Sequence, residues 1–229
     1  MTECISVSGI PFRENLRSHE ELYYAPGGYG RMSKNALENV TSSLKGNREL
    51  LMKKKIISLG KNYTIMDKSH NPLCYVRLNW GSNVGGAIVS NYAGKWAGRM
   101  MNYTYTVSDK EDQTALEIRK SGGSWKARFD VAEPETGERI GIIDLKRTFL
   151  IGGIRANWLD PKSGQIMIAT KGNVIRRKYR MVDGSGNEIA KVRHKIAAIR
   201  DVWKLETASG NENLHAVIFS TVLDFEKEM

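Results

Sequence analysis

The run Leu214–Phe225, near the end of the chain, is almost wholly apolar and predicts a helix without a polar face. A surface helix keeps polar residues on one side at a period of about 3.6, whereas large apolar residues here point in most directions. Such a short run cannot cross a hydrocarbon layer of about 30 Å, which takes about 20 residues. We therefore expect protein, rather than lipid, to enclose this helix and expect the helix to be the nucleus of the fold.

Turn-forming clusters recur along the chain, and short runs rich in β-branched and aromatic residues flank them. Tyr63–Met66 and Leu73–Leu78 flank one turn, and Arg176–Met181 and Ile189–Arg193 flank the turn Asp183–Asn187. Alternation with a period of two predicts one buried face for each strand. Strands in this order, with no helical segments between them, favour an antiparallel barrel or sandwich over a parallel βαβ sheet.

Closure of the sheet explains the apolar helix. An open sheet of roughly twelve strands leaves two unpaired edges, and closure removes them while creating a lumen that must be filled. We therefore predict a mainly β fold, a closed antiparallel β-barrel of about twelve strands around a central hydrophobic C-terminal α-helix. The last strand is expected at Val202–Glu206, after a basic linker at Ile196–Arg200.

The first part of the chain lacks the hairpin pattern. It is rich in turn-forming residues and contains one short helical pattern with Leu37, Val40 and Leu44 on one face. We predict two parts: an N-terminal arm at residues 1–48, which contains a short helix and is partly irregular, and a barrel domain at residues 49–229.

Composition narrows the class of protein. With 229 residues, 41% of them hydrophobic and 26% charged, the chain is typical of folded domains and not of disordered segments. Its two cysteines, Cys4 and Cys74, have no spacing that suggests zinc or a disulfide framework. The N-terminus also lacks the pattern of a secretory signal. We expect a monomeric cytoplasmic protein, with peripheral association at membranes left open.

Motifs for catalysis are missing from the sequence. There is no Gly-x-Ser-x-Gly elbow, no His-Glu-x-x-His pair and no phosphate-binding loop of the Gly-x-x-x-x-Gly-Lys type. The four histidines show no ligand spacing, and His215 is expected to be a hydrogen-bonded residue of the core or rim. We predict no enzymatic activity, no cofactor and no metal site.

A basic hairpin is the best candidate site. The net charge is +10, and two strands around one turn carry cations on alternate residues, namely Arg176, Lys178, Arg180, Lys191, Arg193 and Lys195. Like charges facing each other across strands cost up to about 1 kcal/mol, so an unpartnered cluster favours an anionic ligand, although Glu188 is close enough to relieve it. The alternative is an ordinary solvated barrel exterior.

Three motifs resemble those of the LURP-one-related proteins and, more distantly, of phospholipid scramblases and the Tubby C-terminal domain. Asn213–Phe225 is an apolar helix that ends in Leu-Asp, and Leu51–Asp67 is a strand that leads into an aromatic-x-Ile-x-Asp turn. The third is Ala190–Lys195, before an Asp-x-Trp strand at Asp201–Trp203. The resemblance covers about residues 50–228.

The resemblance implies a twelve-stranded barrel around a central helix. Tubby domains are associated with phosphoinositide headgroups and scramblases with calcium-dependent lipid movement, whereas the LURP-one-related group has no agreed biochemistry. This sequence lacks the cysteine-rich stretches of scramblases, and Thr207–Glu212 lacks their acidic run. Calcium-triggered scrambling is therefore not expected.

Charge and resemblance together predict a non-enzymatic domain that binds anionic phospholipid headgroups, such as phosphoinositides, at membrane surfaces through the basic hairpin. A nucleic-acid-binding module would use the same charge. A protein-interaction scaffold is the other alternative, in which the basic strands meet an acidic protein and the N-terminal arm orders on binding.

Overall fold

Twelve antiparallel strands form a closed barrel in the computed structural model, which describes residues 35–55, 62–79, 102–122, 126–148, 153–173, 178–197 and 200–228. The first strands are β1 (Glu49–Lys55), β2 (Asn62–Met66), β3 (Pro72–Asn79), β4 (Thr104–Ser108), β5 (Thr114–Gly122) and β6 (Lys126–Ala132). They are followed by β7 (Arg139–Thr148), β8 (Gly153–Leu159), β9 (Ile166–Asn173), β10 (Lys178–Asp183), β11 (Glu188–Ala197) and β12 (Arg200–Thr207). Helix α1 (Ala36–Leu44) precedes the strands and helix α4 (Asn213–Glu228) follows them.

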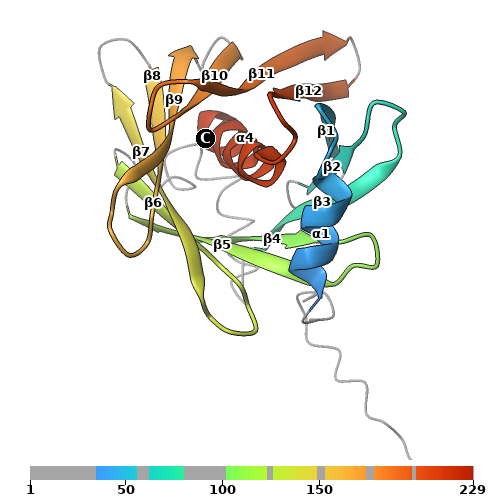
Figure 1. The fold of residues 1–229 in the computed structure, drawn as a ribbon, viewed down its shortest axis with the longest axis horizontal. Coiled ribbons are helices and arrows are strands. Elements are labelled where there is room, and N and C mark those ends of the chain that lie inside the picture. The colour runs from blue at the N-terminus through green and yellow to red at the C-terminus, as the bar shows by residue number, and fades with distance from the viewer. Residues whose placement is uncertain are drawn as a thin grey trace, which may run out of the picture.

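Each strand pairs with its neighbours in the sequence, and β1 pairs with β12 to close the ring. In this closing pair Leu51 lies opposite Lys204, and Lys53 lies opposite Val202. Figure 1 shows α4 inside the ring of strands. The predicted closed barrel around a C-terminal helix is therefore confirmed, and this is the architecture that the resemblance implied.

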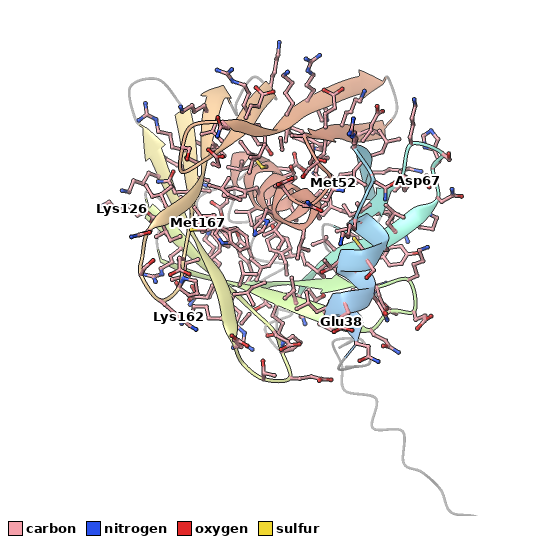
Figure 2. All side chains as sticks on the ribbon, viewed as in Figure 1. Glu38, Met52, Asp67, Lys126, Lys162 and Met167 are labelled. Carbon is pink, nitrogen blue, oxygen red and sulfur yellow. The ribbon has the colours of Figure 1, made fainter. Side chains whose placement is uncertain are left out.

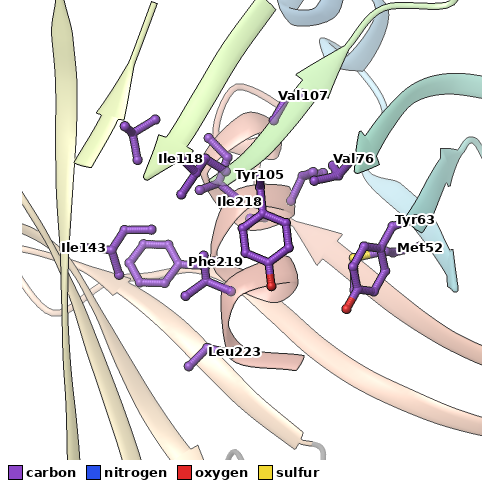
Figure 3. Packing of buried hydrophobic residues seen from close by; sticks show 14 of the residues in the cluster. Met52, Tyr63, Val76, Tyr105, Val107, Ile118, Ile143, Ile218, Phe219 and Leu223 are labelled. Carbon is purple, nitrogen blue, oxygen red and sulfur yellow. The ribbon is translucent and has the colours of Figure 1, made fainter. Parts of the chain in front are cut away.

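Helix α4 is enclosed from Ala216 to Glu226. Val217, Ile218, Phe219 and Leu223 are fully buried, and side chains from strands on several sides of the barrel meet them (Figure 3). Each large apolar side chain that leaves water contributes about 1.5–3 kcal/mol before conformational entropy is subtracted. The run that dominates the sequence is therefore the centre of the hydrophobic core.

Helix α1 packs against β3, β5 and α4, beside the point where α4 enters the barrel. Its residues Ala36, Val40 and Leu44 are buried in the same core as the barrel strands. The side-chain amide of Asn213, at the start of α4, donates hydrogen bonds to the backbone carbonyls of Leu44 (2.6 Å) and Asn47 (2.7 Å). These two bonds join the segment before the barrel to the central helix.

Aspartates close the hairpins at the end of the barrel where α4 begins. In the β10–β11 turn, Asp183 Oδ1 accepts hydrogen bonds from the backbone amides of Ser185 (2.9 Å) and Asn187 (2.8 Å). The Asn187 side chain, followed by its backbone amide, lowers the pKa of Asp183. Asp67 and Asp160 occupy equivalent turns, and their pKa values are lowered in the same way. The turn chemistry read from the sequence therefore has a specific hydrogen-bonding cause.

The predicted basic linker at Ile196–Arg200 is wrong. Strand β11 continues to Ala197 and β12 begins at Arg200, and these two residues are paired across the strands. Pairing persists because each added residue gains ladder hydrogen bonds for its backbone groups. Only residues 198–199 separate the strands, and they lie outside the described residues.

Candidate functional site

The outer face of β10 and β11 carries four of the six cations that the sequence singled out. Lys178, Arg180 and Arg193 are exposed and Lys191 is half-buried, whereas Tyr179 and the other residues that alternate with them point into the core. The predicted alternation is therefore confirmed for these four residues. Nitrogen-tipped side chains project outward from this part of the barrel in Figure 2.

The side chains of the other two predicted cations, Arg176 and Lys195, are not described by the structure. Arg176 lies outside the described residues. Lys195 is paired with Val202 in the β11–β12 register, but its side chain is outside the described part of the chain.

The register brings the cations together in like-charged pairs. Lys178 lies opposite Arg193, and Arg180 lies opposite Lys191. Directly opposed side chains have Cβ atoms about 4.5–5.5 Å apart, and opposed like charges are destabilising. Unless carboxylates or a ligand intervene, this arrangement therefore costs free energy.

Glu188 relieves one of the two pairs. Its carboxylate lies 3.6 Å from Arg180 and 3.0 Å from Lys191. For Lys178 and Arg193, by contrast, the described residues place no carboxylate within ion-pair distance. The two halves of the hairpin therefore differ. In the half farther from the turn, the charge of Arg193 acts on the Glu206 carboxylate of β12, but no ion pair among the described residues relieves the opposed cations.

Strand β9 extends the cationic surface on one side, because exposed Lys171 lies opposite Arg180. On the other side, Lys204 of β12 is held by Glu49 (2.8 Å) and Glu206 (2.8 Å), so the surface there is balanced. We define the basic face by its described cations, Lys171, Lys178, Arg180, Lys191 and Arg193. Against these five cations the same strands carry two carboxylates, Asp183 and Glu188, a balance of +3 to which Lys195 of β11 adds one more positive charge.

The wall formed by β6 and β7 shows a different arrangement. There, Arg128 and Arg139 lie 3.9 Å and 3.3 Å from Asp130, and Lys146 lies 3.5 Å from Asp144. Most exposed cations of that wall therefore already have a carboxylate. Lys126 lies opposite Lys146 in this wall, and that opposed pair has the Asp144 carboxylate beside it, whereas Lys178 and Arg193 have no carboxylate within ion-pair distance among the described residues.

A second polar cluster, which the sequence did not indicate, lies inside the barrel at the end of α4. Lys120 Nζ is 2.9 Å from Glu226 Oε1, and both side chains are fully buried. Arg147 donates to the backbone carbonyl of Glu226 at 2.8 Å and also to its carboxylate. Tyr103 donates its hydroxyl to the same carboxylate, and burial, followed by the charge of Glu226, raises the pKa of this tyrosine.

Polar contacts continue along the helix from this cluster. Tyr63 donates a hydrogen bond to Asp224 Oδ2 (3.0 Å), and Lys54 lies 3.9 Å from the same oxygen. Tyr179 donates to the Ser220 hydroxyl (3.0 Å). Because these acceptors already have donors, the arrangement is typical of a structural network that fixes the helix in the barrel.

His215 lies near the other end of α4, with its ring edge-on to Trp158 at a centroid distance of 4.6 Å. Burial lowers the pKa of this histidine. The predicted hydrogen bond is missing at Nδ1, which has no partner in the described structure. No group of three or more His, Cys, Asp or Glu side chains within the described ranges could hold a metal ion.

Comparisons with known proteins decide the family. The sequence profile described as LURP-one-related matches residues 48–224. The chain belongs to the LURP-one-related family. Its basic face and its central helix up to Asp224 lie within the matched residues, whereas α1 precedes them.

A search of curated proteins gave no match. Among solved structures, the X-ray structure of an Arabidopsis thaliana protein is similar at 15% sequence identity, with a TM-score of 0.49, over 82% of this chain and 96% of that one. No helix in the described ranges has both the length and the apolar composition needed to cross a membrane.

Proposed function

We propose that this LURP-one-related barrel is a non-enzymatic domain that binds anionic phospholipid headgroups, such as phosphoinositides, through its basic face. The observation that carries the proposal is the pair formed by Lys178 and Arg193. The two cations face each other across β10 and β11, are exposed, and have no carboxylate within ion-pair distance among the described residues. A phosphate group between them would replace repulsion by two charge-assisted hydrogen bonds.

The expected strength suits reversible docking. A basic residue near an anionic leaflet contributes about 1 kcal/mol. The five cations of the basic face, less the two carboxylates Asp183 and Glu188, leave a charge of +3. That charge corresponds to about 3 kcal/mol, or about a hundredfold in affinity. A phosphoinositide with several phosphates would add contacts to individual cations.

The composition of the basic face favours a headgroup over single-stranded nucleic acid. Single-strand binders stack bases on exposed aromatic side chains. The described part of β9–β11 offers no exposed aromatic ring, because Tyr179 is buried and the ring of the half-buried His194 packs against the buried Trp203. An acidic protein surface remains an outcome that the experiment below distinguishes.

Flotation with vesicles tests the proposal on the full chain. The variant Lys178→Ser/Arg193→Ser removes the pair, and Lys126→Ser/Arg128→Ser is its matched control. The control pair consists of one exposed lysine and one exposed arginine on β6, which is separated from β10 by β7, β8 and β9. We expect binding to vesicles of phosphatidylcholine with phosphatidylserine or a phosphoinositide to fall about 30-fold in the first variant, at about 1 kcal/mol per cation, and to change little in the control.

Two results would contradict the proposal. Equal losses in the two variants would show that only overall charge matters. Unchanged vesicle binding in Lys178→Ser/Arg193→Ser, together with weaker binding of mixed oligonucleotides or of an acidic protein, would identify one of the alternatives.

A further inference from the structure

Two large apolar side chains are exposed beside the basic face. Within the described ranges, the exposed large hydrophobic residues are Ile166 (50% exposed) and Met167 (51% exposed), which are consecutive in β9. Most apolar residues of the barrel strands are enclosed, so a neighbouring exposed pair is a specific feature of this part of the surface. Met167 is labelled in Figure 2.

Strand geometry places these side chains and the cations on one wall. Met167 and Lys171 are four residues apart, so alternation directs both outward, whereas Ile168 between them is buried. At about 3.3 Å per residue the two positions are about 13 Å apart along the strand. Ile166 begins β9 and lies opposite Leu159 of β8, so it sits at the rim of the same wall.

A flat anionic leaflet fits this combination better than a second copy of the chain does. A symmetric dimer would bring the same patch face to face with itself, which would place the cations of one copy against the cations of the other. Two side chains also provide much less than the roughly 800 Å² per partner of a stable interface. A membrane interface, by contrast, accepts apolar side chains into the acyl boundary while cations contact the phosphates.

We infer that Met167 and Ile166 insert into the leaflet when the basic face docks, so that β9–β11 is a mixed apolar and cationic membrane-docking surface that fixes the orientation of the barrel. This inference rests on the proposed headgroup binding. It adds a contribution that salt does not screen, because burial of apolar side chains is not electrostatic.

A fluorophore placed on the strand reports insertion directly. In a Cys4→Ser background, Met167→Cys is labelled with an environment-sensitive dye, and Lys126→Cys on β6 serves as the control position. The native Cys74 is fully buried and is not expected to react. With vesicles of phosphatidylcholine and phosphatidylserine, we expect a blue shift and quenching by acyl-chain nitroxide lipids at position 167 but not at position 126.

Affinity gives the second readout. Ile166→Ser/Met167→Ser is expected to weaken vesicle binding by about tenfold, because each side chain still has apolar surface to bury. This loss is expected to persist in high salt, whereas the loss in Lys178→Ser/Arg193→Ser shrinks.

Each contrary result has a distinct meaning. If the chain binds vesicles while the dye at position 167 stays in water and Ile166→Ser/Met167→Ser binds normally, insertion is wrong and headgroup binding stands. If the chain binds no anionic vesicle, both fail. If ultracentrifugation shows a dimer that Ile166→Ser/Met167→Ser dissociates, a second copy covers the pair and the inference is overturned.

Discussion

Replacement of Glu226 by glutamine is expected to destabilise the barrel strongly. Glu226 is fully buried, and its carboxylate is 2.9 Å from the equally buried Lys120 ammonium. Arg147 and Tyr103 also donate to this carboxylate. Glutamine keeps the shape and an acceptor oxygen but removes the negative charge, so Lys120 and Arg147 would remain as cations without their carboxylate.

The magnitude follows from the burial of both charges. Breaking a buried ion pair by removing one partner costs about 3–5 kcal/mol. Domains of ordinary stability have about 5–15 kcal/mol in total. With a urea dependence of about 2 kcal/mol per molar, we expect Glu226→Gln to lower the urea midpoint by about 2 M.

Lys120→Met is the matched control, since it removes the other partner. Glu226 then keeps Arg147 and Tyr103 as donors. The loss is a charge-assisted hydrogen bond of about 1.5–3 kcal/mol, partly offset because no lysine charge has to leave water. The order of stability is expected to be wild type, then Lys120→Met, then Glu226→Gln, with Lys120→Met/Glu226→Gln more stable than Glu226→Gln alone.

Urea unfolding followed by circular dichroism and tryptophan fluorescence measures these differences, because Trp158 and Trp203 are buried in the core. Surface substitutions usually change stability by no more than about 0.5 kcal/mol. A Glu226→Gln effect of that size would place Glu226 in water and refute the enclosed network. An additive Lys120→Met/Glu226→Gln variant would show that the two charges do not interact.

Three further predictions concern the core and the turns. Gly141→Ala is expected to destabilise the fold by at least the usual cost of overpacking, about 1–3 kcal/mol, because an added Cβ would lie 2.2 Å from two ring carbons of Trp158. Thermal unfolding measures this loss, and an unchanged melting temperature would contradict the close packing of Gly141 against Trp158. Burial raises the pKa of the Cys74 thiol to about 12. In a Cys4→Ser background, we therefore expect Cys74 to react with a thiol reagent only after urea unfolds the chain; rapid reaction of the folded protein would show that the thiol is accessible. Asp183→Ala is expected to be less stable than wild type at neutral pH. Because the folded pKa of Asp183 lies below its unfolded value, that difference is expected to shrink as pH falls below about 4 and to be smallest once pH is below the folded pKa; a difference that does not shrink over this range would exclude a contribution from the ionised carboxylate.

The sequence was sufficient for the architecture because its dominant signals are local. The apolar run predicted the enclosed helix, although α4 extends from Asn213 to Glu228 and so begins earlier and ends later than Leu214–Phe225. Alternation along β10 and β11 predicted which cations point outward. The segment Ile196–Arg200 was wrongly predicted as a linker, because the ends of two long strands joined by a very short connection resemble a linker when the strand pairing is not known.

The buried charges were missed although the signal was present. Lys120 continues the inward alternation of Leu116 and Ile118, and Arg147 continues that of Ile143 and Leu145. Extending each strand pattern to its end would have predicted cations inside the barrel. Their partner Glu226 could not be assigned from alternation, because it comes from the helix and its position depends on how deeply α4 enters the lumen.

Long-range contacts set the remaining limit. The sequence indicated that Glu188 could relieve the basic hairpin. Only the structure showed that Glu188 pairs with Arg180 and Lys191, and that Lys178 and Arg193 have no carboxylate within ion-pair distance among the described residues. No local pattern marks the exposure of Met167, which depends on where β8 and β9 begin to pair.

Binding of the unaltered chain to neutral and anionic vesicles over a range of NaCl concentrations tests headgroup recognition most directly. We expect binding to phosphatidylcholine vesicles only when phosphatidylserine or a phosphoinositide is included, and we expect that binding to weaken as salt screens the basic face. Equal binding to neutral and anionic vesicles, or no binding to either at low salt, would contradict a cationic headgroup site on β9–β11.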